Sequence, residues 1–218
     1  MLPRVVLLVL FVSSPLIVIA QGSIEVIDAI GRKVSLSQPA SRIISLSPHT
    51  TEMLYVAGAG EQLIAAVDYS DYPAAASKLP RVGGYKRLDL EAILALKPDL
   101  VVVWESGNAS EQLAQLERLG LTLYYTEPRQ LEDIAEDVKK LGKLSGHSGI
   151  SQKWSLDYLA RVTSLRQQYS SAQPVTMFYQ IWNQPLMTVN GQHLISEVIR
   201  LCGGRNIFSQ LPVMTPKV

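Results

Sequence analysis

Hydrophobic runs and amphipathic stretches alternate along the middle of the chain, from Arg42 to Lys143. Four short hydrophobic runs are each followed by a stretch whose apolar residues recur at helical spacing. The run LVVVW at 100–104 is apolar on both faces, which is typical of a central strand in a parallel sheet. The alternation therefore predicts right-handed crossovers that connect the strands of a single parallel sheet.

The pattern differs on both sides of this region. Residues 23–37 alternate between apolar and polar around Gly31, which predicts a hairpin. Residues 148–170 repeat apolar positions at helical intervals, and they predict one helix of roughly 30 Å. A strand at 175–182 and a helix at 194–201 then begin another unit. We therefore predict an α/β fold of two parallel-sheet lobes joined by a single long helix, with the second lobe incomplete.

This prediction divides the chain into four parts. They are a signal peptide at 1–20, an N-terminal α/β lobe at 21–147, an interdomain helix at 148–171 and the start of a C-terminal α/β lobe at 172–218.

The first twenty residues combine one early positive charge, Arg4, with an apolar run from Val5 to Ala20. Small residues before Gln21 match the cleavage site of a secretory signal peptide. A membrane-spanning helix is the alternative, but the run is short for a bilayer core of ~30 Å and is interrupted by two serines and a proline. No cysteine lies near the cleavage site to carry a lipid anchor. We expect a soluble protein that is exported to the periplasm.

The chain has one cysteine, Cys202. In an oxidising compartment an unpaired cysteine suggests a missing partner or a free thiol. We expect Cys202 to be a disulfide candidate whose partner would lie beyond Val218. The alternative is a buried, unpaired cysteine that acts as a small hydrophobic residue.

Composition and motifs exclude several functions. The 218 residues carry a formal net charge of +1, so no strong field attracts nucleic acid. Gly58 and Gly60 resemble part of a dinucleotide fingerprint but follow a helix and precede a strand, which is the reverse of the required order. No catalytic elbow, phosphate loop or CxxC pair occurs, so we predict no enzyme. His147 and His193 lie beside no cluster with metal spacing, and we predict no bound metal and no cofactor.

Aromatic residues occupy the loops that follow the predicted strands. Tyr69 lies in YSDYP, Tyr85 in GGYKRLD and Trp104 in WESGN, while Trp182 ends the first strand of the second lobe and precedes the turn that follows it. Ligands of open parallel sheets bind beyond the carboxyl ends of the strands. Aromatic rings there suit a large flat ligand, and ordinary packing is the alternative for each. His49 lies near the same cleft in a first helical turn, but we do not expect it to bind a metal.

Four segments together carry a resemblance to a known family. They are RIISLSP, TEMLYVAGAGEQLIAAVDYSDYP, LDLEAILALKPDLVVVW and RLCGGRNIF. The chain resembles the substrate-binding proteins of ABC importers for iron chelates and cobalamin, and within that family it is most similar to the cobalamin-binding members. The resemblance runs from about Ile24 to the end. It implies two α/β lobes that hold the ligand between them, and about one quarter of the protein missing from this chain.

The resemblance also implies roles for individual residues. Tyr69, Tyr85 and Trp104 match cleft aromatics that contact the corrin ring, and Trp182 is a further ligand-binding candidate. Glu91 matches an acidic residue that docks onto arginines of the membrane permease, although the helix dipole alone would explain a carboxylate there.

The predicted function is capture of cobalamin in an interlobe cleft and its delivery to an ABC permease with its ATPase, by a monomer. One alternative is the same type of receptor for an iron siderophore or haem. Another, of a different class, is an exported sensing or scaffold module without a permease.

Overall fold

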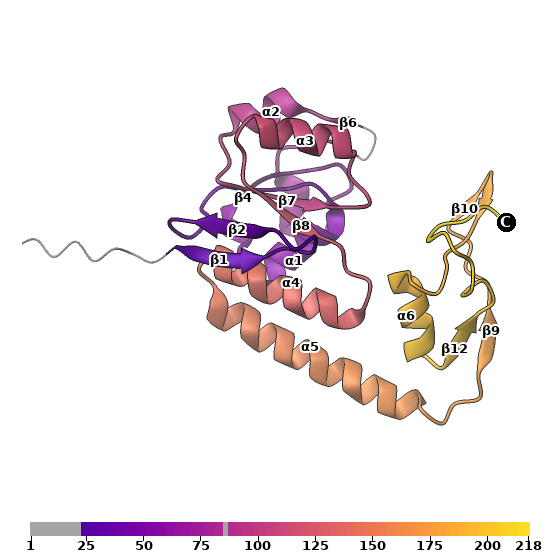
Figure 1. Cartoon of the computed structure of the whole chain (residues 1–218). Coiled ribbons are helices and arrows are strands. Elements are labelled where there is room, and N and C mark those ends of the chain that lie inside the picture. The colour runs from indigo at the N-terminus through magenta and orange to yellow at the C-terminus, as the bar shows by residue number, and fades with distance from the viewer. Residues whose placement is uncertain (1–22, 85–86) are drawn as a thin grey trace, which may run out of the picture.

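The computed structural model describes residues 23–84 and 87–218, and the predicted signal peptide lies outside the described residues. Figure 1 shows a first lobe, the long helix α5 beneath it, and a second lobe at the far end of α5.

The helices are α1 (Pro48–Val56), α2 (Leu90–Ala95), α3 (Ser110–Arg118), α4 (Leu131–Leu144), α5 (Ser148–Tyr169) and α6 (Leu194–Leu201), with 3-10 turns η1 (Gly60–Gln62) and η2 (Ala74–Lys78). The strands are β1 (Ile24–Ile27), β2 (Lys33–Leu36), β3 (Ile43–Ser45), β4 (Leu63–Ala66), β5 (Gly83–Gly84), β6 (Arg87–Leu88), β7 (Leu100–Trp104), β8 (Leu123–Thr126), β9 (Val175–Met177), β10 (Trp182–Asn183), β11 (Leu186–Met187) and β12 (Gly204–Asn206).

The core of the first lobe is a four-stranded parallel sheet in the order β4-β3-β7-β8. Strand β7 lies inside the sheet between β3 and β8, and its residues Leu100 to Val103 are all buried. This confirms the prediction that the doubly apolar run LVVVW forms a central strand. Because all four strands are parallel, their carboxyl ends and the loops that follow them lie along one edge of the sheet.

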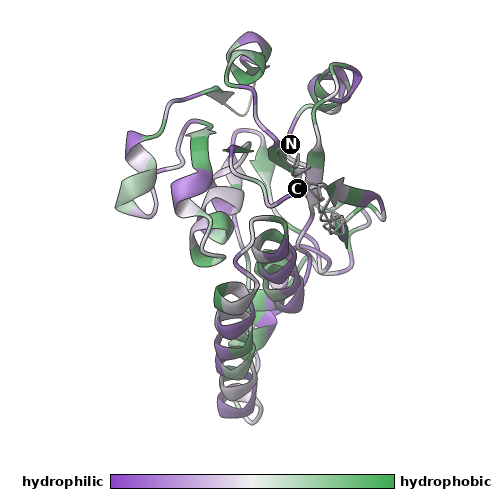
Figure 2. Cartoon of the chain, turned by 90° about the vertical axis from the view of Figure 1, so that its left-hand side faces the viewer, coloured by the Kyte–Doolittle hydropathy of each residue, from purple (hydrophilic) through white to green (hydrophobic). Residues whose placement is uncertain are grey.

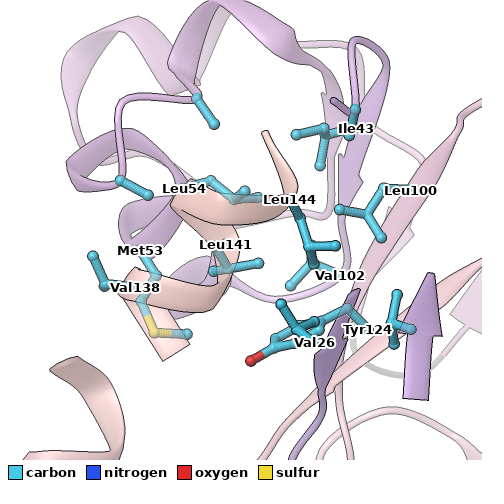
Figure 3. Packing of buried hydrophobic residues seen from close by; sticks show 14 of the residues in the cluster. Val26, Ile43, Met53, Leu54, Leu100, Val102, Tyr124, Val138, Leu141 and Leu144 are labelled. Atoms are coloured by element: carbon cyan, nitrogen blue, oxygen red, sulfur yellow. The ribbon is translucent and has the colours of Figure 1, made fainter. Parts of the chain in front are cut away.

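Alternation along the strands supplies two hydrophobic layers. Leu100 and Val102 pack with Leu54 and Leu141 on one face, where Figure 3 shows the side chains of β3, β7, α1 and α4 in contact. Val101 belongs to the cluster on the opposite face, beneath α2 and α3. Each face of the sheet is therefore covered by helices, as parallel sheets require.

Local signals set the ends of α1 and of the hairpin. The Ser47 side chain accepts a hydrogen bond from the Thr50 backbone, and Pro48 occupies the first helical position, where its missing N–H costs nothing. Gly58 follows the helix with φ +93°, and Gly31 turns the β1-β2 hairpin with φ +80°. Both are left-handed conformations that favour glycine. These features were predicted and are confirmed.

The long helix α5 contains 22 residues. Its first half packs closely on α4 because small residues meet there: Ser155 Oγ donates to the Ala135 carbonyl at 2.8 Å, and a Cβ on Gly142 would lie 2.0 Å from Ser151 Oγ. In Figure 2 the helix is mixed in hydropathy along its length, with no single apolar stripe. A uniform stripe is absent because α5 contacts α4 of the first lobe and also α6 of the second lobe.

An ion-pair network joins α5 to both lobes. The Arg166 guanidinium pairs with Glu132 at the start of α4 and, at 3.0 Å, with Glu197 of α6. Arg200 also pairs with Glu197. One side chain of the long helix therefore contacts the first and the second lobe at once. The division of the chain at 147 and 171 stays a prediction.

The second lobe contains a parallel pair, β9 and β12, a short β10-β11 hairpin and α6. The prediction of one strand over 175–182 was wrong, because strand β9 ends at Met177 and β10 begins at Trp182. The reason is that the partner strand β12 offers only three residues for pairing. Within residues 23–84 and 87–218, no helix has the length and apolar content needed to cross a bilayer.

A buried polar pair lies under the β1-β2 hairpin. The Tyr124 hydroxyl donates to Asp137 Oδ1 at 2.6 Å, and both side chains are buried. Burial raises the pKa of Asp137 to about 6, because the charged carboxylate loses its hydration there. Its folded-state pKa thus lies above its ordinary value of 3.8. The contribution of Asp137 to stability is therefore present below about pH 4 and is lost as the pH rises through about 6.

We predict that Asp137→Asn stabilises the protein by up to about 3 kcal/mol at pH 7.5, but by only about 1 kcal/mol at pH 4.5. The amide oxygen can still accept from Tyr124, while the buried charge is gone. Urea unfolding at the two pH values measures the difference from wild type. His49 titrates in the opposite sense, but it is present in both proteins and cancels. Asp157→Asn, on the exposed side of α5, is the matched control. An equal loss in the free energy of unfolding at both pH values for Asp137→Asn would contradict the prediction.

Candidate ligand cavity between the lobes

A cavity of about 760 Å³ lies between the two lobes above α5. Its first-lobe wall comes from α1, from the loops after β7 and β8, and from the start of α4. Its floor comes from α5, and its second wall comes from the second lobe. The lining residues are His49, Glu52, Met53, Val56, Trp104, Ser106, Glu127, Pro128, Arg129, Ile134, Trp154, Tyr158, Ile181, Gln192, His193, Leu194, Met214 and Thr215.

Trp104 forms part of the first-lobe wall because it ends strand β7. Its backbone N–H donates to Asn108 Oδ1 at 2.8 Å, and Asn108 Nδ2 donates to the Leu46 carbonyl at 2.8 Å. The amide of Asn108 thus ties the end of β7 to the segment after β3. Gly107 lies against the indole, where a Cβ would come within 1.8 Å of Trp104 Cε3. The backbone therefore holds the ring at a fixed place on the wall.

His49 lies beside Trp104 on the same wall, with ring centroids 5.1 Å apart and the planes perpendicular. Burial lowers the pKa of His49 to about 4, so the imidazole is neutral at neutral pH. Its Nδ1 lies 3.1 Å from Ser47 Oγ. Behind Ser47 a chain of buried hydroxyls continues through Thr50 and Ser45. This chain fixes the first turn of α1 and with it the position of His49.

The floor of the cavity carries a second aromatic pair. Trp154 and Tyr158 lie one turn apart on α5 and stack with centroids 5.0 Å apart and an interplanar angle of 11°. In the sequence they were indistinguishable from core positions of the long helix, since both belong to its apolar repeat. Their common spacing of four was the only available signal, and it does not separate a core face from a cavity face.

Polar side chains from both lobes also line the cavity. Glu127 Oε2 accepts from the Ser106 backbone at 3.1 Å, and Arg129 is exposed. Across the cavity His193 caps α6, where its Nδ1 accepts from the Ile195 backbone at 3.1 Å. Burial lowers the pKa of His193. A cavity that combines apolar and aromatic surface with polar groups at defined places is suited to binding a small molecule.

The predicted site residues separate into two groups. Trp104 lines the cavity, whereas Tyr69 is 81% exposed and Trp182 is 63% exposed, and neither borders it. The Trp182 indole N–H donates to the Gln184 carbonyl at 3.0 Å. Tyr85 lies outside the described residues. Roles in ligand binding for all four residues stay predictions.

Glu91 lies apart from the cavity, on the first turn of α2 after the Asp89 cap, and is exposed. Cys202 caps the other end of α6 and is exposed, so the alternative of a buried hydrophobic thiol is wrong. Its predicted disulfide is untested. In the part of the chain that the structure describes, no three His, Cys, Asp or Glu side chains gather in a way that could hold a metal ion.

Comparison with known proteins places this architecture in a class. Residues 43–216 match the periplasmic binding protein family, and the chain belongs to that family. It is 44% identical over 180 residues to the vitamin B12-binding protein of Vibrio cholerae serotype O1, covering 83% of this chain and 65% of the relative. The corresponding protein of Photorhabdus laumondii is 44% identical over 184 residues, covering 84% and 67%. The chain thus spans about two thirds of the length of these relatives.

Solved structures agree on the fold. The crystal structure of the periplasmic vitamin B12 binding protein of Vibrio cholerae superposes with a TM-score of 0.78 at 44% identity, covering 83% of this chain and 71% of that one. The periplasmic heme-binding protein of Roseiflexus sp. RS-1 in its apo form superposes with a TM-score of 0.72 at 23% identity, covering 82% and 70%. The second likeness shows the shared fold alone.

We predict that Gly107→Ala displaces the Trp104 indole from the cavity wall. The added methyl would overlap the ring, and overpacking of this kind costs about 1–3 kcal/mol unless the ring moves. The expected result is a changed tryptophan emission and near-ultraviolet circular dichroism with the far-ultraviolet spectrum unchanged. Gly149→Ala is the matched control, since nothing lies within 4 Å of its Cβ position. An unchanged emission spectrum in Gly107→Ala would refute the placement of the ring.

Proposed function

We propose that this chain captures cobalamin between its two lobes and delivers it to the permease of an ABC importer. It would act in the periplasm after export directed by residues 1–20. The observation that carries the proposal is the interlobe cavity lined by aromatic residues, in a chain 44% identical to proteins named for binding vitamin B12. No catalytic role is proposed, because the relatives are binding proteins.

The chemistry of the cavity fits a large ligand with flat faces and a polar periphery. Trp104 and His49 offer ring surfaces from the first lobe. Glu127, Arg129 and Gln192 offer hydrogen-bonding groups at its edges. Cobalamin is larger than the drug-sized ligands that cavities of ~300–1,000 Å³ enclose. The cavity would therefore hold part of the ligand, and the exposed rings of Tyr69 and Trp182 remain free to cover what extends outside it.

Haem and iron siderophores are the alternative ligands. The cavity lining contains one arginine, Arg129, together with Glu52 and Glu127. Such a balance of charge does not favour a strongly anionic chelate, which would need several cations around it. Haem, being flat and metal-centred, is the better of the two and is included in the test. A sensing or scaffold module would bind the ligand without docking on a permease.

Cyanocobalamin should quench the tryptophan fluorescence of the purified chain in a saturable manner. We expect Trp104→Leu to weaken binding roughly tenfold, about 1.4 kcal/mol, because a ring face is lost from the wall. Haemin and a ferric hydroxamate siderophore are titrated in parallel. Saturable binding of haemin in place of cyanocobalamin would overturn the choice of ligand, and no binding of any of the three would remove the function.

We also propose that Glu91 docks on cationic residues of the permease. It is exposed on a surface away from the cavity, so a charge change there leaves ligand binding untouched. Glu91→Ala should weaken binding to the permease in nanodiscs about tenfold, with cobalamin affinity unchanged. Glu111→Ala is the matched control, an exposed glutamate in the first turn of α3. Equal effects of both substitutions would mean that Glu91 has no specific contact.

A further inference from the structure

A long stretch at the start of the second lobe is open to solvent. Every residue from Thr163 to Leu186 is exposed, and this stretch includes all of strand β9. Four of its apolar side chains, Val175, Met177, Phe178 and Tyr179, expose between 38% and 64% of their surface. Parallel strands normally occur with both faces covered. Within the described residues, β9 is therefore a parallel strand without the cover that such strands usually have.

Strand β9 also forms the outer edge of its sheet. Among the described strands it pairs with β12 alone, and α6 contacts β12. Figure 1 shows β9 on the outside of the second lobe. On the β12 side, the Met177 carbonyl accepts from the Ile207 N–H at 3.1 Å. Successive residues of a strand direct their backbone groups to opposite edges, so the N–H and C=O of Thr176 face the free edge.

This edge strand lacks the features that keep natural edges from pairing. Such edges are protected by charged side chains, above all lysine, or by proline. Residues 167–196 contain no Lys, Arg, Asp or Glu, although these residues make up 18% of the chain. Residues 175–182 also contain no proline and are mainly β-branched, aromatic or otherwise apolar, which is typical of strands that pair between chains. Because the edge is uncharged, it can meet an identical edge without repulsion.

We propose that β9 pairs with β9 of a second copy of this chain, antiparallel across a twofold axis at Thr176. In this arrangement the two Thr176 residues would exchange both of their backbone hydrogen bonds. A twofold contact of this kind uses the free edge of β9 on both copies, so association ends at a dimer. The dimer replaces the monomer expected from the sequence. It is independent of the proposed function, because no residue of β9 lines the interlobe cavity.

The exposed apolar surface determines how strong the contact is. A whole aromatic side chain has roughly 150–250 Å² of surface, so the exposed fractions of Val175, Met177, Phe178 and Tyr179 leave roughly 350 Å² on each copy. A patch of this size is comparable to the largest patch on a typical monomer, which is often functional. It is smaller than the ~800 Å² that each partner contributes to a stable complex. We therefore expect a weak and reversible dimer.

Sedimentation velocity over a concentration series of the whole chain tests the proposal. We expect a monomer–dimer equilibrium with a dissociation constant on the order of 10–100 µM. Val175→Lys should weaken the dimer about tenfold or more, because it places like charges on both sides of the twofold axis. Thr176→Pro should have a similar effect, since it removes the N–H on the free edge and leaves the bonds to β12 in place.

Val213→Lys is the matched control. Val213 is 58% exposed, compared with 64% for Val175, and it belongs to the same lobe but lies outside β9. We expect this substitution to leave the dissociation constant within about twofold of wild type. Circular dichroism establishes that each variant is folded, and Val175→Lys alone decides the question if Thr176→Pro is not folded.

Three results would overturn the proposal. The first is a chain that stays monomeric up to about 300 µM, well above the expected dissociation constant. The second is a dimer that Val175→Lys weakens no more than Val213→Lys does, or that persists in folded Thr176→Pro, because the contact would then lie elsewhere. The third is association that continues beyond the dimer, because a twofold pairing of β9 is closed.

Discussion

The packing of α5 against α4 is the contact on which the rest of the arrangement depends. The two helices approach closely because Gly142, Ser151 and Ser155 present almost no side-chain volume at the contact. Helix α4 is itself fixed to the sheet by Val138, Leu141 and Leu144. The long helix therefore leaves the first lobe in a direction that the core of that lobe determines. A bulky residue at Gly142 would separate the helices and move everything beyond them.

The cavity follows from this direction. Because α5 runs beneath the edge where the parallel strands end, its upper surface becomes a floor and the strand-end loops become a wall. The Arg166 network holds α6 of the second lobe near the start of α4, so the opposite wall also has a defined place. Exposed ion pairs of this kind contribute about 0.2–1 kcal/mol each, so they orient the lobes more than they stabilise them.

Much of the fold could be predicted because its signals are local. Ser47 and Pro48 mark the start of α1, the doubly apolar run marks β7, and the periodic stretch at 131–144 matches α4 at both ends. The strand expected over 175–182 failed because its length depends on a partner far along the chain. The composition of a segment does not show how many residues of a partner strand are available to pair with it.

The cavity was harder to predict than the sheet. Trp104 could be found because a residue at the end of a parallel strand has a known place. Trp154 and Tyr158 could not, because a helix face that borders a cavity has the same apolar spacing as one that borders a core. Tyr69 and Trp182 were expected near the ligand, yet their rings lie further out than the enclosed volume. The spacing of residues in the sequence predicts which of them lie at the edge of a sheet. It does not predict which of them border an enclosed cavity.

Tyr158 borders two cavities, the one between the lobes and a second one lined also by Leu131 of α4 and Leu201 of α6. Truncation of this one side chain would therefore enlarge both hollows at once. Truncation of its stacking partner Trp154 would enlarge only the interlobe one, because Trp154 does not border the other.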